Sequence, residues 1–545
     1  MTAAKKINYL LLFTVMIMIF ISFVVIFVCI YPVDFDNMGG MHSWLSAATI
    51  KYVNQWLEEG ALHNHFTCYE SFPSVEFQSY DARTPYISYP TGSTFLVFAA
   101  AKILGKVHIG ISFLKKYQLL LYLAEALFFS VFLYCWLTDF EVKERVKAAV
   151  VYVTVLSWIL LPVNVWYLAN VYFADQAVIF FVMLFLLCEY ISHRRISDRQ
   201  RKIANGWKIL VIYCGSMTDY YFWILVFLAF ICHLFRQILL KHDLGMIVKS
   251  ALLYICPVVL AIGTFVWQIS YTNDWLNILK HKFLSRTGDM DHVWKTIFDN
   301  FCSTMADNKM ERGIAILGIE IFILILLVFY FHKMGKWKEL FIKNEYSIVM
   351  IGLAAPFLQI IVLKQHSAIH EFSMIKMGWV LVMSVLILAL LAFTWMRRSE
   401  IYFGKKKTDL FGCCYVPAFL VMFALTGGPF AVSDSLMLRD AKVSYDLEKI
   451  LYESAKYNDV FFSFTYSIPI NPPQQLAVSQ KQVYLIADIK DIAVQFPDLP
   501  EEANKMLIVE KNAEKDVSVL ESEATLLKDS SILYEDEGYM IAQFP

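Results

Sequence analysis

The sequence predicts an α-helical membrane protein with about eleven spans, followed by a small α/β domain outside the membrane. Of its 545 residues, 58% are hydrophobic and 16% are aromatic, and the mean hydropathy is +0.53. Soluble globular proteins are much more polar than this. The net charge of −1 gives no indication of nucleic-acid binding. Apolar runs recur until about residue 430, where a more polar tail begins.

The apolar runs divide into segments of a length that suits a lipid bilayer. We expect spans near 8–31, 114–137, 147–166, 174–192, 207–218, 220–239, 247–270, 314–331, 346–363, 373–396 and 410–429. The fifth and sixth segments are short and share the polar link SMTDYY. They are therefore also compatible with a re-entrant pair.

Lysine and arginine residues predict the orientation of these spans. Lys5 and Lys6 precede the first span, which places the N-terminus in the cytoplasm. With alternating spans, roughly twenty basic residues fall on the inside segments and about one falls on the short outside links. The inside segments include VKERVK, HRRISDRQRK, FRQILLKHD, HKMGKWKELFIK and MRRSEIYFGKKK. The loops 32–113 and 271–313 and the tail 431–545 are then extracytoplasmic.

The two long outer loops are expected to carry helices that lie on the membrane surface. Trp44, Tyr52 and Trp56 share one face at intervals of four residues, as in an interfacial helix. The apolar stretch 92–104 is too short to cross a bilayer. In the tail, the runs DVFFSF, KQVYLIADI, KMLIVEK and SILYEDEGYMIAQF resemble strands. The tail therefore predicts a small exterior α/β domain at 431–545.

Acidic residues directly after the first span are the first catalytic candidates. Asp34 and Asp36 lie close enough to the headgroup layer to meet a lipid phosphate. A carboxylate there could accept an acceptor's proton or stabilise positive charge on a sugar. The alternative is a solvated turn, because glycines follow both aspartates. His42 adds a titratable group nearby.

Polar residues at the outer ends of later spans form a second set of candidates. In LKQHSAIHEFSMIK, Lys364 and His370 could hold a phosphate, although Lys364 could also snorkel to the interface. Asp175 begins the fourth span, where it either faces a cavity or benefits from the helix dipole.

The long loop 271–313 adds three basic residues near helical spacing. These are Lys280, Lys282 and Arg286, which are compatible with a binding role, a solvated face or contact with lipid headgroups.

Several motifs resemble the GT-C superfamily of polyprenyl-phosphate-sugar glycosyltransferases, in particular bacterial family 39 relatives of protein O-mannosyltransferases and aminoarabinose transferases. HSWLSAATIKYVNQWLEEG is similar to the HxWRQADTA…EG pattern of one branch, and YPTGSTFLVFAAAKILG resembles a second stretch of that branch. YFADQAVIF and the HEFSMIK region are similar to later family segments. The resemblance covers 1–430 as a layout.

The resemblance implies a GT-C-like transmembrane domain and a set of site residues. The branch's aspartate falls at Ala48, so Asp36 is the expected catalytic carboxylate, with Asp34 as the alternative. The residues expected to bind the donor phosphate or another part of the substrate are His42, Lys364, His370, Asp175, Tyr89 and Lys280. No cofactor and no metal ligands are expected, although a divalent cation is compatible with the chemistry.

The resemblance implies a membrane glycosyltransferase in the bacterial plasma membrane. It would move a sugar from a polyprenyl-phosphate donor to an extracytoplasmic glycan, lipid or protein acceptor. Membrane lipid would be a further partner, and nucleic acid would not. Two alternatives stay open: a transporter or flippase for a lipid-linked glycan, and a non-catalytic GT-C-like assembly protein of the cell envelope.

Overall fold

The structure is a computed structural model that describes most of the chain. It describes residues 7–545 except 39, 41, 78–82, 141, 194–196, 273, 289, 307–308, 334–343, 399–409, 427–443 and 469–472. The predicted domain boundary at 430 lies outside the described residues. So do most of the expected inside segments HKMGKWKELFIK and MRRSEIYFGKKK.

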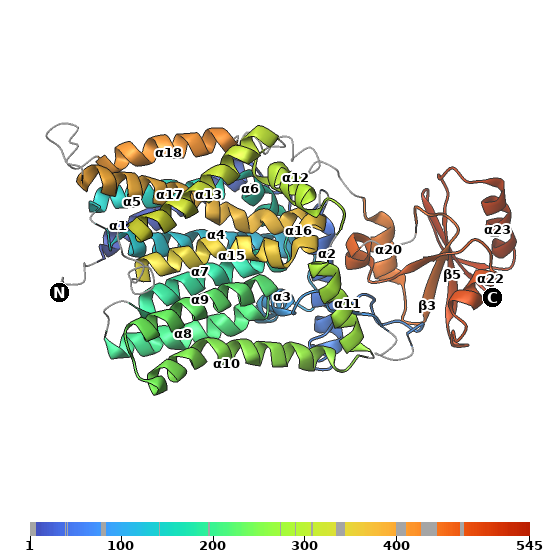
Figure 1. The fold of residues 1–545 in the computed structure, drawn as a ribbon. Helices are drawn as coiled ribbons and strands as arrows, with labels where there is room; N and C mark the ends of the chain where they lie inside the picture. The colour runs from blue at the N-terminus through green and yellow to red at the C-terminus, as the bar shows by residue number, and fades with distance from the viewer. Residues whose placement is uncertain are drawn as a thin grey trace.

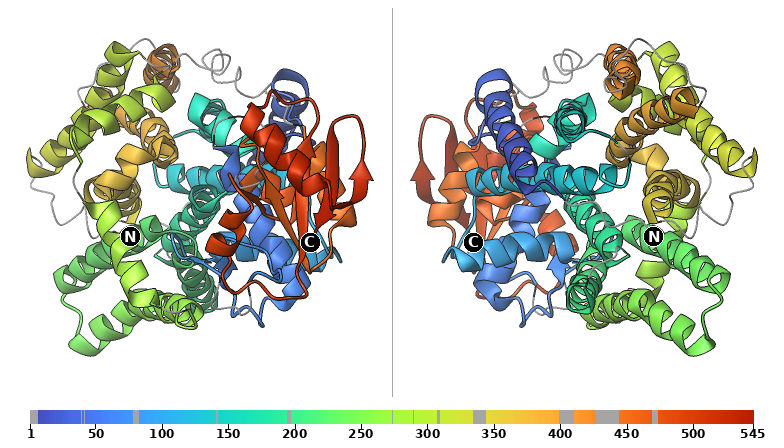
Figure 2. Two further views of the ribbon diagram at one scale, coloured as in Figure 1. Left: turned by 90° about the vertical axis from the view of Figure 1, so that its right-hand side faces the viewer. Right: turned by 90° about the vertical axis from the view of Figure 1, so that its left-hand side faces the viewer.

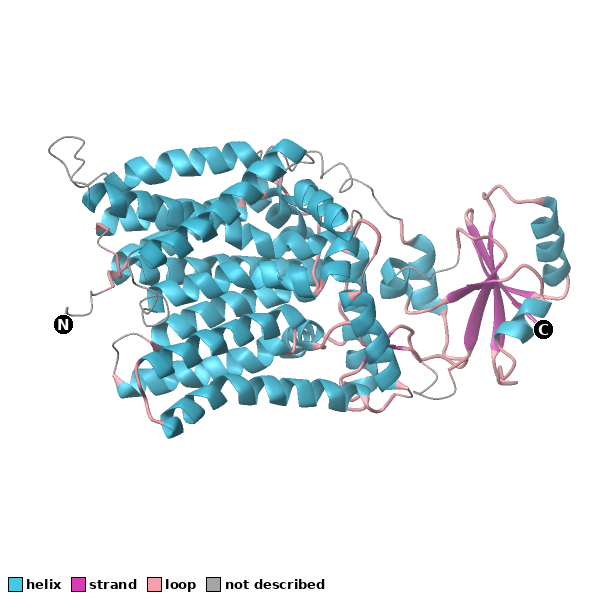
Figure 3. Cartoon of the chain, viewed as in Figure 1, coloured by secondary structure: helices cyan, strands magenta, loops and turns pink. Residues whose placement is uncertain are grey.

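A helical bundle and a small sheet unit make up the described chain (Figure 1). The long helices of the bundle run side by side, and the sheet unit lies beyond one end of them (Figure 3). The long helices are α1 (Tyr9–Val25), α4 (Ile111–Leu137), α5 (Glu144–Ile159), α7 (Ala174–Ser192), α8 (Asp198–Ser216), α9 (Tyr220–Leu239), α10 (Leu244–Ile269), α13 (Met310–Lys333), α15 (Asn344–Val362), α17 (Ile375–Arg398) and α18 (Leu410–Thr426).

Six helices among the described residues are long and apolar enough to cross a membrane, or up to seven if one bent pair counts as a span. The chain is therefore an integral membrane protein, but the predicted count of eleven spans is not confirmed. One reason is visible in α8, whose first half is charged and whose apolar half covers only the expected fifth segment. Two other expected spans correspond to shorter apolar helices, Tyr346–Val362 and Tyr415–Thr426.

Short helices collect at the end of the bundle that faces the sheet unit (Figure 1). They are α2 (Ser43–Gln55), α3 (Gly92–Ile103), α6 (Pro162–Asn170), α11 (Trp275–Thr287), α12 (Val293–Met305) and α16 (Lys364–Ile369). α6 follows α5 with a bend of 67°, and Pro162 stands at its start, where a missing N–H costs nothing. The loops in which surface helices were expected, 32–113 and 271–313, hold α2, α3, α11 and α12, whereas α6 and α16 lie outside those loops.

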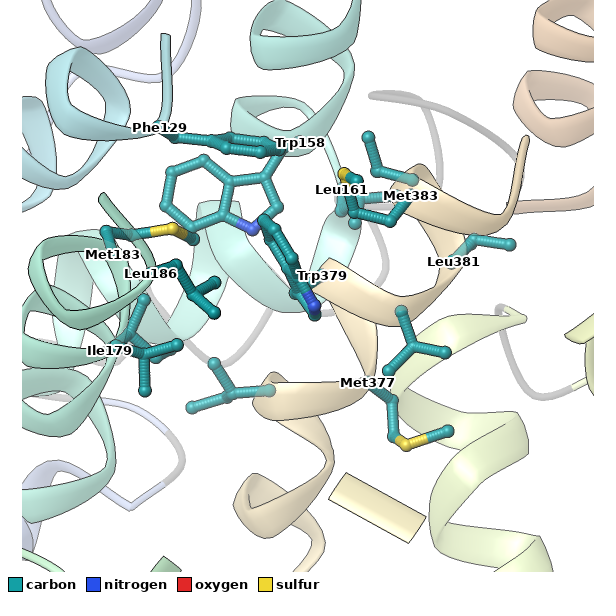
Figure 4. Close-up of a cluster of buried hydrophobic side chains, with 14 of the residues drawn as sticks. Phe129, Trp158, Leu161, Ile179, Met183, Leu186, Met377, Trp379, Leu381 and Met383 are labelled. Carbon is teal, nitrogen blue, oxygen red and sulfur yellow. The ribbon is translucent and has the colours of Figure 1, made fainter. Parts of the chain in front are cut away.

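Large aromatic side chains fill the centre of the bundle. Trp158 and Trp379 lie close to Phe129 in this core, with ring centroids 5.8 and 5.1 Å from the Phe129 ring (Figure 4). The three side chains come from α5, α17 and α4. Their packing fixes α17, whose first turn carries a buried lysine described below.

The tail folds into a five-stranded sheet of strand order β4-β3-β5-β7-β6. β3 is parallel to β4 and β5, whereas β7 is antiparallel to β5 and β6. The strands are β3 (Asp459–Ser463), β4 (Val483–Leu485), β5 (Asn504–Glu510), β6 (Ser531–Glu535) and β7 (Tyr539–Phe544). The four strand-like runs of the sequence correspond to the five strands, with β5 beginning one residue before its run.

The sheet unit is docked on the first loop. Its helix α21 (Pro473–Ser479) packs against α2, and the buried side chain of Ala477 joins the core of α2, α3 and α4. Gln474 donates a hydrogen bond to Ser43 (3.2 Å), and the Tyr484 hydroxyl donates one to Glu76 (3.0 Å). Viewed along the bundle, the sheet covers the N-terminal helices (Figure 2).

Candidate active site

A buried lysine between two carboxylates forms the centre of the candidate site. The Lys376 ammonium lies 2.5 Å from Asp175 Oδ1 and 2.8 Å from Asp219 Oδ2. The three residues are between 0% and 3% exposed. They come from the start of α7, the α8–α9 link and the first turn of α17. Because a charge buried without a partner is very costly, this triad ties three distant helices together.

Local structure explains why each carboxylate lies there. Asp175 occupies the first turn of α7, where the helix dipole favours an anion. Asp219 is the N-cap of α9 and accepts a hydrogen bond from the Tyr221 amide at 2.9 Å. Asp175 Oδ2 is buried and has no hydrogen-bond partner among the described residues. One carboxylate oxygen of the triad is therefore uncommitted.

A buried arginine lies next to the triad. Arg286, in the last turn of α11, is 9% exposed and sits over the rings of Tyr89 (4.4 Å) and Tyr220 (5.2 Å). No hydrogen bond or ion pair joins it to any residue that the structure describes. The planar guanidinium is therefore positioned by its packing on two aromatic rings, and its N–H donors stay able to bind an anion.

A close backbone approach brings Tyr89 to this position. The Gly92 amide donates a hydrogen bond to the Met217 carbonyl (2.6 Å), two residues before Asp219. A Cβ at Gly92 would collide with that carbonyl, so the glycine of the YPTGS motif has a structural reason. The first loop is thereby fixed against the α8–α9 link.

Two histidines line the same region and are uncharged near neutral pH. The Tyr89 hydroxyl and His366 Nε2 are 2.9 Å apart, and the rings of His366 and His370 lie 4.7 Å apart. Burial, followed by the nearby Arg286 charge, lowers the pKa of His366 well below its ordinary value. The same two causes lower the pKa of His370 to about 4. His370 therefore offers a neutral ring rather than a cation.

A second carboxylate group borders the cluster. His42 Nε2 lies 3.4 Å from Glu371 Oε1, and the Tyr167 hydroxyl donates to the same oxygen at 3.2 Å. Phe372 packs against both His42 and His370, with ring centroids 5.2 and 4.9 Å away. Both Glu371 and His42 are partly exposed, so this edge is open to solvent.

The structure brings together four of the residues that the sequence singled out: His42, Tyr89, Asp175 and His370. Among the described residues, neither Asp34 nor Asp36 makes a hydrogen bond or an ion pair with these four residues. Both aspartates are exposed; Asp34 Oδ1 accepts a hydrogen bond from the Asp36 amide (3.0 Å).

The side chain of Asp36 lines a different hollow. This hollow has a volume of about 320 Å³ and lies between the first loop and the sheet unit, with His108 and Lys449 also in its wall. Of the expected cationic groups, Lys280 is exposed on α11 and Lys364 is half-exposed at the start of α16. Catalytic roles for Asp34 and Asp36 stay predictions.

Sequence reasoning missed Lys376 and Asp219. Lys376 is the last residue of the HEFSMIK region, which was noted only as a resemblance, and Asp219 lies in SMTDYY, which was noted only as a polar link. The signal that could have found them is the cost of a lysine in an apolar span, which demands an acidic partner at the same depth. Asp175 and Asp219 are both acidic residues at the outer boundary, so the pairing was available from the predicted orientation.

Comparisons with known proteins concern the fold. No protein-family model matches the sequence, and no curated protein matches it either. ArnT from Cupriavidus metallidurans bound to undecaprenyl phosphate is similar in structure, with a TM-score of 0.53 and 9% identity over 98% of this chain and 97% of that one. An apo oligosaccharyltransferase from Archaeoglobus fulgidus gives a TM-score of 0.56 and 9% identity over 92% of this chain and 69% of that one.

A third similar structure is archaeal AglB from Archaeoglobus fulgidus in complex with an inhibitory peptide and a dolichol-phosphate. Its TM-score is 0.52 at 9% identity, over 92% of this chain and 69% of that one. All three are GT-C structures. The chain has the GT-C fold. The predicted GT-C-like fold class, with its small C-terminal sheet, is confirmed.

Proposed function

We propose that this GT-C chain is a membrane glycosyltransferase that moves a sugar from a polyprenyl-phosphate donor to an acceptor outside the cytoplasm. The observation that carries the proposal is Arg286, a buried guanidinium with aromatic contacts and no ionic partner among the described residues. The fold gives further support, because similar structures hold undecaprenyl phosphate and dolichol-phosphate.

In the proposed reaction, the acceptor oxygen forms a bond to the anomeric carbon while the bond from that carbon to the phosphate oxygen breaks. The polyprenyl phosphate leaves with one additional negative charge. Donors already fixed in place stabilise such a charge without reorganisation. Arg286 can offer two parallel N–H groups to the phosphate, and a neutral His370 ring can offer one N–H.

The acceptor hydroxyl must lose its proton, and the chain offers two carboxylates for that step. Asp36 stays our proposed base from the sequence. Asp175 is the competing candidate, because its Oδ2 is uncommitted and lies in the cluster that contains Lys376. Lys376 would then hold Asp175 in its ionised form.

We further propose a bacterial plasma-membrane location with the N-terminus in the cytoplasm and the sheet unit outside. The short helices and the sheet unit share one end of the bundle (Figure 1), and the basic inside segments are expected at the other end. A donor would enter from the outer leaflet.

The binding test uses undecaprenyl phosphate and the full-length protein in detergent. We expect Arg286→Ala to weaken binding by about 10² to 10³-fold, since a lost charge-assisted bidentate contact has that effect on an anion. Arg286→Lys should recover only part of the affinity, because lysine lacks the fork. Lys282→Ala, an exposed change on the same helix, is the matched control. Equal binding by Arg286→Ala and Lys282→Ala would contradict the proposal.

A transfer test separates the function classes. In membranes loaded with a radiolabelled sugar on the polyprenyl carrier, wild-type protein should release the label from the carrier. Asp36→Asn or Asp175→Asn should slow this release by about 10² to 10⁴-fold, whichever residue is the base. A flippase would move the labelled lipid between leaflets without consuming it. An assembly protein would do neither.

A further inference from the structure

The inner end of α7 holds a second buried cluster, which the proposed reaction does not use. Glu189 lies 14 residues after Asp175, about 21 Å along the helix at 1.5 Å per residue. Its carboxylate meets His193 Nε2 at 2.9 Å, and the Tyr254 hydroxyl lies 2.7 and 2.9 Å from its two oxygens. Glu189 is 4% exposed and Tyr254 is 1% exposed.

Two histidines complete a set of metal-ligating groups at this end. One ligand atom each from Glu189, His193 and His233 lies within 4.8 Å of the others. Glu189 lies in the last turn of α7, His193 is the C-cap residue of that helix at i, i+4 spacing, and His233 comes from α9. The histidine rings are stacked with centroids 5.5 Å apart. No other group of this kind occurs among the described residues.

An unpaired nitrogen gives an independent indication of a missing ligand. His233 is 7% exposed, and its Nδ1 is buried without a hydrogen-bond partner among the described residues. Its Nε2 lies 3.1 Å from the Gln237 amide nitrogen. A histidine that ligates a metal through one nitrogen donates the N–H of its other nitrogen to an acceptor, so metal binding at Nδ1 requires the Gln237 amide to turn its oxygen towards Nε2. A buried imidazole nitrogen without a partner is otherwise costly.

We propose that Glu189, His193 and His233 bind a divalent transition-metal ion of the Zn²⁺ class. Two imidazoles and one carboxylate suit such an ion, whereas Mg²⁺ and Ca²⁺ prefer all-oxygen sites. Three protein ligands leave a fourth position for water. The ion would cross-link the inner ends of α7 and α9. The proposal does not depend on the glycosyltransferase function.

Lys208 is the competitor for this site. Its ammonium lies 3.1 Å from Glu189 Oε2, on the opposite oxygen from His193, and over the Tyr254 ring at 4.6 Å. An ammonium beside the site repels a divalent cation. Metal binding therefore requires Lys208 to give up part of its contact with Glu189, and the affinity is expected to rise when Lys208 is removed.

The test uses full-length protein in detergent and Co²⁺, whose visible spectrum reports imidazole ligands, with Zn²⁺ as the competitor. We expect one equivalent of Co²⁺ to bind and to be displaced by Zn²⁺. His193→Ala and His233→Ala should each weaken binding at least about 10-fold. Lys208→Met should tighten it. His281→Ala, an exposed histidine on α11, is the control and should bind as the wild type does.

Three results would overturn the proposal. The first is that the wild-type protein binds no more Co²⁺ than the same detergent buffer without protein. The second is an unchanged spectrum and stoichiometry in His193→Ala, which tests the site even where His233→Ala does not fold. The third is an equal loss in His281→Ala, which would indicate adventitious binding. Chelation should also lower the Tm of the wild type and leave the Tm of His193→Ala unchanged.

Discussion

The two ends of α7, which are the outer and the inner end in the proposed orientation, carry buried clusters with similar components but with different groups left without a partner. At the outer end, Lys376 is held by two carboxylates, and the groups left over are the Arg286 guanidinium, a charged donor of hydrogen bonds, and a single carboxylate oxygen, Asp175 Oδ2. At the inner end, Lys208 is held by one carboxylate, and the atom left over is His233 Nδ1, an imidazole nitrogen that offers a lone pair when the ring proton is on Nε2. The outer cluster is therefore suited to an anion and the inner cluster to a cation.

The difference teaches that burial of a lysine does not by itself identify a functional site. The side chains of both lysines are at most 3% exposed, and each lysine forms an ion pair with at least one carboxylate. What separates the clusters is the chemistry of the atoms that stay uncommitted beside the ion pair. A buried charge that is fully paired holds helices together, whereas an uncommitted group of one sign indicates what could bind.

The largest effect is expected from removing the lysine of the outer cluster. Lys376→Met should lower the free energy of unfolding by about 3 to 5 kcal/mol, because it leaves two buried carboxylates without a cation. Thermal denaturation of the purified protein measures it. The triple variant with Asp175→Asn and Asp219→Asn should recover most of the loss. If the triple variant is no more stable than Lys376→Met, charge burial is not the cause.

A smaller effect is expected at the inner cluster. Lys208→Met should cost about 1.5 to 3 kcal/mol, the range for one charged hydrogen bond, because Glu189 keeps the Tyr254 hydroxyl and His193. The same denaturation experiment applies, without added metal. If Lys208→Met lowers the free energy of unfolding as much as Lys376→Met does, the two clusters depend equally on their lysines. The expected difference in stability between the two ends of α7 would then be wrong.

Composition and periodicity were enough to predict a helical membrane protein with a small C-terminal α/β domain, whereas the GT-C-like part of the fold class came from the motif resemblance. The surface helix α3 followed from its length. The stretch 92–104 is too short to cross a bilayer and forms α3 (Gly92–Ile103). The number of spans was not predictable in the same way. Apolar segments such as 207–218 are parts of helices whose other half is charged, and hydropathy alone does not separate these from spans.

The candidate site was predictable only where a residue's own sequence context is unusual. Asp175 stands out because it begins an apolar span. Its partner Lys376 lies 201 residues away, and a single sequence does not reveal contacts at that separation. Asp34 and Asp36 were singled out by their position after the first span, and in the structure both are exposed and joined by a local hydrogen bond from the Asp36 amide to Asp34 Oδ1.

The smallest effect concerns pH and the outer cluster. The pKa of His370 lies near 4 in the folded protein, against an ordinary value of 6.5, because burial and the Arg286 charge disfavour its protonation. The unfolded chain therefore binds the proton more readily. The contribution to stability is complete above about pH 6.5 and is lost as the pH falls towards 4.

Replacement of His370 by glutamine should remove this pH dependence. The Tm of the wild type should fall between pH 6.5 and 4 by more than the Tm of His370→Gln, with His281→Gln as the exposed control. The difference should be modest, since His370 is partly exposed and shares its surroundings with His366. Parallel curves for wild type and His370→Gln would mean that the outer cluster does not hold this ring neutral.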